Sequence, residues 1–130
     1  MDSAFNFIMD NGILEEGNTV EELMWLFTDP EDSNQFNAFV SVDDKNSIIG
    51  VIGYVLSQYI QGAKEIFGVT PFSWKLKSGY KGMDGVSLFK KVSELEEIGI
   101  TIGGSEIAKK LYKLFKYKLM VQSSNYYKIL

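Results

Sequence analysis

The 130-residue sequence contains no cysteine, no histidine and no arginine. The lack of cysteine excludes disulfides, thiolate nucleophiles and cysteine zinc clusters. The lack of histidine excludes an imidazole base and a Ser-His-Asp triad. All 13 basic residues are lysines, so an anion site must use lysine, serine, tyrosine or backbone N–H groups. A general acid or base must come from tyrosine, glutamate, aspartate, lysine or an amine of the chain terminus or the substrate.

Long apolar runs are also missing. No run reaches the roughly 18 residues that span a bilayer, and residues 1–3 lack the basic start of a secretory leader. Hydrophobic residues make up 45% of the chain, which is enough for a core at this length. We therefore expect one domain, residues 1–130, in a soluble cytoplasmic protein with no membrane partner.

Charge is distributed unevenly along the chain. Residues 1–44 hold 11 acidic side chains and no lysine, whereas residues 45–130 hold all 13 lysines and six acidic side chains. The basic part fits a small polyphosphate ligand or a set of solvated helix faces. Nucleic acid is not expected as a partner, because the lysines are spread over several elements without an RNA-binding signature.

Hydrophobic periodicity predicts an alternation of helices and strands. Helical spacing favours helices at residues 4–11 and 20–27, and the β-branched run 47–56 reads as a central strand covered on both faces. Residues 59–68 are ambiguous. The other expected elements are strands at 36–42, 72–77, 98–102, 118–122 and 125–130 and helices at 85–97 and 106–117. This order predicts an α/β (α+β) fold, with a mixed sheet and crossover helices.

The richest chemistry lies where the strand at 72–77 enters a glycine-bearing loop that opens a helix. Successive N–H groups at such a junction favour an anion, and glycine lets a ligand approach the backbone. Residues 81–86 are therefore a candidate phosphate-binding loop. Asp84 conflicts with this interpretation, because a carboxylate repels phosphate; its simpler role is that of a helix N-cap. A plain strand-to-helix turn is the alternative for the whole loop.

The same stretch resembles the coenzyme A site of the GNAT-type N-acyltransferases, and the resemblance covers roughly residues 36–130. The family's loop has the form Pro-x-Tyr-Arg-Gly-x-Gly-x-Gly; Tyr80 and Gly82 match, and Lys81 stands where Arg is usual. Downstream, Ala108, Leu111 and Tyr112 match Ala-x-x-Leu-Tyr, while Lys116 and Tyr117 replace a closing Gly-Phe. The chain also looks like a subgroup of surface-sugar biosynthesis through Trp74, residues 98–103 and residues 125–130.

The resemblance implies a GNAT-like twisted sheet and transfer of an acetyl group from acetyl-CoA to a primary amine. The resemblance to the subgroup implies that this amine belongs to an amino sugar or a sugar nucleotide. It places Tyr112 as the general acid that protonates the coenzyme A thiolate, and the backbone near Leu76 as the holder of the acyl carbonyl. The remaining cofactor-binding residues that it implies are Lys81, Gly82, Met83, Asp84, Gly85, Val86 and Ser105. Ordinary core and capping roles are the alternatives for Leu76, Tyr112 and Ser105.

Several questions stay open at this stage. The base that deprotonates the amine is not identified, with Glu22, Asp43, Glu65 and water all conceivable. Trp25 is expected in the core rather than in an acceptor pocket. An inactive GNAT-like domain that binds a ligand or a partner is the rival function, and the terminal strand leaves a homodimer open.

Overall fold

The computed structural model describes residues 2–10, 20–29, 31–32, 36–80, 82–101 and 104–118. Within these residues the chain forms four helices and four strands. They are α1 (Asp2–Asp10), α2 (Val20–Phe27), β1 (Ala38–Val42), β2 (Ile48–Gln61), β3 (Lys64–Leu76), α3 (Met83–Ser93), β4 (Ile98–Gly99) and α4 (Glu106–Leu114). No helix of the described residues is long and apolar enough to span a membrane.

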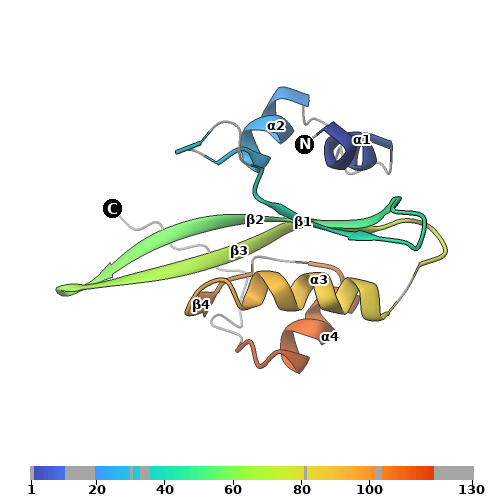
Figure 1. The fold of residues 1–130 in the computed structure, drawn as a ribbon. Coiled ribbons are helices and arrows are strands. Elements are labelled where there is room, and N and C mark those ends of the chain that lie inside the picture. The colour runs from blue at the N-terminus through green and yellow to red at the C-terminus, as the bar shows by residue number, and fades with distance from the viewer. Residues whose placement is uncertain are drawn as a thin grey trace.

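The strands form one mixed sheet in the order β1-β2-β3-β4. β1, β2 and β3 are antiparallel neighbours, and α3 carries the chain over to β4, which pairs parallel with β3. Helices α1 and α2 lie on one face of the sheet, and α3 and α4 lie on the other (Figure 1). The predicted fold class, a mixed sheet flanked by helices, is therefore confirmed.

The centre of β2 separates two hydrophobic cores. Val51 packs with Phe7, Ile8 and Phe27 beneath α1 and α2. The next residue, Ile52, points to the opposite face because side chains alternate along a strand. It belongs to the core beneath α3, which also contains Val69, Leu88, Phe89 and Val92. The prediction of a strand covered on both faces is confirmed for the buried segment of β2.

The ambiguous segment 59–68 is the tip of a long hairpin. β2 continues through Gln61, Gly62 turns the chain with a φ of +64°, and β3 starts at Lys64. The predicted strand at 72–77 is thus only the last part of a longer strand. The strand predicted at 98–102 shortens to Ile98–Gly99. The strand predicted at 125–130 lies outside the described residues, and so does the strand predicted at 118–122 apart from its first residue, Lys118.

The expectation for Trp25 is wrong. Its side chain is 76% exposed, whereas Phe27, two residues further along α2, is fully buried. Residues two apart in a helix point in nearly opposite directions, so burial of Phe27 against the sheet turns Trp25 to solvent.

Candidate active site

β3 contains an irregularity that redirects its backbone. Gly53 pairs with Phe72 and Val51 pairs with Lys75, so Ser73 and Trp74 together oppose the single residue between them on β2. Ser73 adopts a left-handed conformation with a φ of +48°. A non-glycine residue in this region costs about 1–2 kcal/mol, so the surrounding structure holds this bulge in place.

The bulge leaves the backbone of Leu76 facing away from β2. The N–H of Lys77 donates to the Ile49 carbonyl oxygen over 2.7 Å, so Lys77 faces β2. Backbone groups of successive strand residues point to opposite edges. The N–H and C=O of Leu76 therefore point toward the other edge, as the predicted carbonyl-holding role requires.

Among the described residues, no strand covers that other edge near Leu76, because β3 and β4 diverge. β4 pairs with β3 at Gly68 and Val69, and the last contact is the N–H of Ile100 donating to the Val69 carbonyl oxygen. From Thr70 to Leu76, β2 is the only strand of the described residues in register with β3. The two parallel strands thus separate toward the end where Leu76 lies, which leaves backbone groups for a ligand.

The start of α3 lies at the same end of β3. Gly82 is the N-cap residue with a φ of +75°, and as a glycine it has no side chain to cap the helix. The first bond within the helix runs from the Val86 N–H to the Gly82 carbonyl oxygen. The N–H groups of Met83, Asp84 and Gly85 therefore have no acceptor within the helix, and they lie at its positive end, where an anion is favoured.

The start of α3 differs from the sequence-based prediction in two details. Met83 to Val86 form the first turn of α3 instead of an open loop, and Lys81 lies outside the described residues. Asp84 is not the N-cap, because the helix begins one residue earlier and Gly82 takes the cap position. Its carboxylate complements the helix dipole, and it would compete with any phosphate for the same amides.

Gly85 packs the helix against the end of β3. A Cβ atom at Gly85 would lie 3.2 Å from Leu76 Cδ1 and 3.4 Å from Trp74 Cζ2. This close approach brings the amides of α3 next to the open edge of β3. A contribution of Gly85 to ligand binding would have to come from its N–H group, because its α-carbon is buried against the sheet.

Tyr112 lies on α4, on the same side of the sheet. Its ring is half-buried against Phe89 of α3, with ring centroids 5.6 Å apart, and Phe89 in turn contacts Trp74 of β3 at 5.4 Å. Burial raises the pKa of the Tyr112 phenol, and a hydrogen bond with the Thr101 side chain partly offsets that rise. The phenol is therefore protonated at neutral pH and able to donate.

The space for this hydroxyl depends on Gly104. A Cβ atom there would lie 2.7 Å from the Tyr112 hydroxyl oxygen, and the φ of +118° also disfavours other residues. Ser105, next along the chain, caps α4 by accepting a hydrogen bond from the Ala108 N–H over 3.2 Å. Sequence reasoning missed Ser73, Thr101 and Gly104. Of these three, only Gly104 had a sequence signal, because it is a glycine directly before the helix cap Ser105.

The lysines of α4 are turned to solvent. Lys109, Lys110 and Lys113 are exposed, and Lys109 forms an ion pair of 3.1 Å with Glu106. This agrees with the solvated-face interpretation of the lysines on α4.

Solved structures share this arrangement of elements over nearly the whole chain. A protein described as a probable acetyltransferase matches with a TM-score of 0.67 and 10% identity, covering 99% of this chain and 91% of that one. The chain has the fold of the GNAT acetyltransferases. No protein-family model matches the sequence, and no curated protein does.

Two further structural matches are aminoglycoside acetyltransferases. The 6'-N-acetyltransferase from Acinetobacter baumannii has a TM-score of 0.64 and 10% identity, with 99% of this chain and 93% of that chain covered. An enzyme from an uncultured soil metagenomic sample, in complex with sisomicin, has a TM-score of 0.58 and 16% identity, with coverage of 97% and 83%. Identities this low establish the shared fold alone.

Proposed function

We propose that this protein is a cytoplasmic N-acetyltransferase that moves an acetyl group from acetyl-CoA to a primary amine. The observation that carries the proposal is the open edge of β3 at Leu76, which lies beside the uncapped amides of α3. A thioester and a diphosphate joined by a flexible arm need these two kinds of backbone site side by side. The GNAT fold supports the same assignment.

Each group of the site would have a separate role in the acetyl transfer. The N–H of Leu76 would donate to the carbonyl oxygen of the thioester, where negative charge grows as the amine attacks the carbonyl carbon. The amides of Met83, Asp84 and Gly85 would hold the diphosphate. As the carbon–sulfur bond breaks, the phenol of Tyr112 would protonate the leaving thiolate. The attacking nitrogen loses its own proton to solvent or to a base not yet assigned.

For the acceptor we propose an amino sugar or a nucleotide-linked amino sugar. The subgroup resemblance implies such a molecule, and one structural neighbour was solved with sisomicin and with trehalose in two separate complexes. A primary amine on a sugar ring presents both the nucleophile and hydroxyl groups for orientation. Paired assays with an amino sugar and with a lysine-containing peptide test this choice, and exclusive use of the peptide would contradict it.

The central experiment combines binding and turnover. Acetyl-CoA and free coenzyme A should both raise the melting temperature, because a ligand at 100 times its Kd adds about 2.7 kcal/mol to the free energy of unfolding. Turnover can be followed by the release of the coenzyme A thiol. The chain has no cysteine, so the protein itself adds nothing to a thiol signal. Binding without any thiol release on a panel of amines would contradict the enzymatic proposal.

Asp84 supports a second candidate function, an inactive GNAT-like domain. Its carboxylate lies in the first turn of α3, where a coenzyme A diphosphate would bind. No change in melting temperature at millimolar acetyl-CoA would favour this candidate. Binding and turnover together would eliminate it.

A further inference from the structure

Among the described residues, one strand edge has no partner strand. β1 pairs with β2 only as far as Gly53, and the contact ends where the Tyr54 N–H donates to the Asn37 carbonyl oxygen over 3.0 Å. β2 nevertheless continues to Gln61 with β3 on its other side. Because Tyr54 faces the β1 side, the backbone groups of Leu56, Gln58 and Ile60 also point outward at this edge. Among the described strands, none pairs with them.

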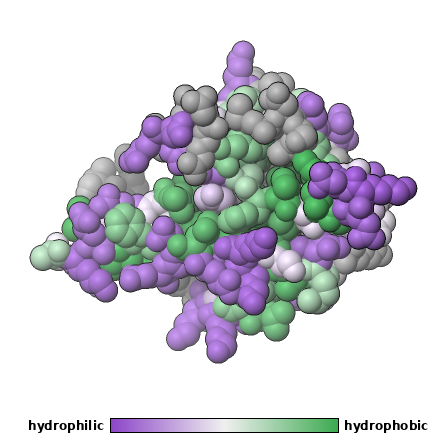
Figure 2. All heavy atoms as spheres, in the orientation of Figure 1, coloured by the Kyte–Doolittle hydropathy of each residue, from purple (hydrophilic) through white to green (hydrophobic). Residues whose placement is uncertain are grey.

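This edge lacks the features that keep strand edges apart. Residues 54–61 contain no charged residue and no proline, and their pairing with β3 is regular. Natural edges are usually protected by charge, proline or a bulge. Leu56 is 47% exposed and Ile60 is 76% exposed. Hydrophobic and hydrophilic residues are mixed over the projecting hairpin at the left of Figure 2.

The edge is also self-complementary. If two copies pair antiparallel about Gln58, Leu56 of each copy meets Ile60 of the other, and Gln58 meets Gln58. Apolar residues thus face apolar residues and amide faces amide, and no like charges meet. An interface of this kind uses the same patch on both copies, as a twofold dimer requires.

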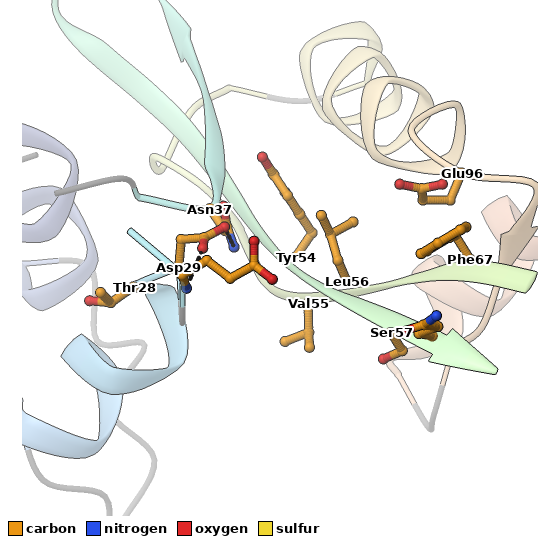
Figure 3. A pocket seen from close by; sticks show the side chains of 11 residues that line it. Thr28, Asp29, Asn37, Tyr54, Val55, Leu56, Ser57, Phe67 and Glu96 are labelled. Carbon is orange, nitrogen blue, oxygen red and sulfur yellow. Dashed lines mark hydrogen bonds between the residues drawn. The ribbon is translucent and has the colours of Figure 1, made fainter. Parts of the chain in front are cut away.

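At the base of the hairpin, the edge runs into an acidic cleft of about 390 Å³. Asp29 and Asn37 line it on the α2 side, and Tyr54 and Leu56 form its wall (Figure 3). Glu31 lines it as well. Backbone hydrogen bonds from Glu31 and Asp32, despite some desolvation, keep the pKa of Asp29 low, so its carboxylate is charged at neutral pH.

Asn37 indicates what the cleft lacks. Its side chain is only 5% exposed, and its Nδ2 donates to Asp29 Oδ2 over 3.3 Å. Its Oδ1 is buried, and no donor among the described residues reaches it. A buried acceptor calls for a hydrogen-bond donor, and the carboxylates of Asp29 and Glu31 that line the same cleft favour a donor with positive charge.

The tip of the same hairpin carries such a donor. Lys64 is exposed, and by alternation along β3 it lies on the same face as Phe72, which packs beneath α1 and α2. When the β2 strands of two copies pair antiparallel about a twofold axis, the α1–α2 faces of both copies lie on the same side of the joined sheet. It also brings the tip of each hairpin to the base of the other. Each Lys64 is thereby carried toward the cleft of the other copy.

We propose that this chain forms a twofold dimer through the β2 edge, with Leu56, Gln58 and Ile60 pairing across the axis and each Lys64 approaching the Asp29–Glu31–Asn37 cleft of the other copy. The sheets of the two copies then join into one continuous sheet. This dimer is independent of the proposed acetyltransferase function. The paired edge belongs to β2, whereas the β3–β4 opening lies on the other side of β3.

Sedimentation velocity over a range of protein concentrations tests the proposal. The wild-type chain should sediment as a dimer at micromolar concentrations and dissociate on dilution. Gln58→Lys and Gln58→Glu each place like charges opposite one another at the axis, and each should be monomeric. Circular dichroism checks that both variants keep the wild-type fold, which is expected because Gln58 is exposed.

Mixing distinguishes the proposed interface from a general loss of association. An equimolar mixture of the Gln58→Lys and Gln58→Glu variants should recover the dimer, because opposite charges then meet at the axis. Lys64→Glu alone should weaken the dimer at least tenfold, and Glu31→Lys in the same chain should restore it. Lys45→Glu in the other hairpin turn is the matched control and should change nothing.

Two results would overturn the proposal. The first is a wild-type chain that stays monomeric up to several hundred micromolar. The second is a dimer that both Gln58 variants leave intact, which would place the contact elsewhere.

Discussion

A lysine that occupies a glycine position at the end of α4 yields a quantitative prediction. After the C-cap Phe115, Lys116 adopts a left-handed conformation with a φ of +65°. Its N–H donates to the Lys113 carbonyl oxygen, and the N–H of Tyr117 donates to the Tyr112 carbonyl oxygen over 2.9 Å. This pair of bonds is a Schellman motif, in which glycine is the preferred residue. Lys116→Gly should therefore stabilise the protein.

The magnitude follows from two opposing terms. A non-glycine residue in this conformation costs about 1–2 kcal/mol, which glycine removes. Glycine also makes the unfolded chain more flexible, at a cost of about 0.4–1 kcal/mol. The net gain should be about 0.5–1 kcal/mol. For a domain of this size, with roughly 2.1 cal/mol/K of unfolding entropy per residue, this raises the melting temperature by about 2–4 °C.

The assay is thermal and urea unfolding of Lys116→Gly beside Lys116→Ala. Both variants remove the lysine charge near the helix C-terminus, so their difference isolates the backbone conformation. Glycine should be the more stable of the two, with an unchanged urea m-value. An alanine variant as stable as the glycine variant would refute the reasoning and show that Lys116 is not strained.

Three further predictions concern the site. Tyr112→Phe should lower kcat by about tenfold or more while leaving the Kd for coenzyme A nearly unchanged, measured by steady-state kinetics and calorimetry; an unchanged kcat would remove Tyr112 from the mechanism. Asp84→Asn should tighten coenzyme A binding about two- to fivefold and slightly lower stability, because the carboxylate opposes phosphate yet favours the helix N-terminus; weaker binding would contradict this. Burial raises the pKa values of Tyr112 and Tyr117 above the unfolded value of about 10. The resulting stability is complete below that pH and is lost as pH rises through the folded pKa values. Unfolding free energy measured from pH 9 to 11.5 should therefore fall, and fall less in Tyr117→Phe.

Local sequence signals identified the elements around the site, although several of their ends differ: the helices predicted at 85–97 and 106–117 are Met83–Ser93 and Glu106–Leu114. Apolar residues at helical spacing predicted α3, and Ser105 predicted the start of α4, because its hydroxyl caps the Ala108 N–H. The unbroken β-branched run in β2 predicted burial on both faces, which Val51 and Ile52 confirm. These features depend on neighbours within a few residues, which is the range over which a sequence pattern predicts structure.

The hairpin tip was not predictable in this way. Residues 59–68 alternate poorly between apolar and polar side chains, because much of this hairpin projects beyond the core. Without a buried face, a strand carries no period-two pattern to recognise. Because the hairpin tip is exposed, its sequence pattern is weak. The same exposure makes it a candidate interface.

Composition alone established that imidazole, thiolate and guanidinium chemistry are absent, and the motif near Gly82 and Tyr112 led to the prediction of a coenzyme A site there. The bulge at Ser73, the outward-facing backbone of Leu76 and the cap position of Gly82 emerged only in the folded chain. Each depends on how β3 is held between β2 and α3, and such register is decided by packing between segments far apart in the sequence. Residue types thus limit the chemistry, and tertiary contacts decide which backbone groups are left free to perform it.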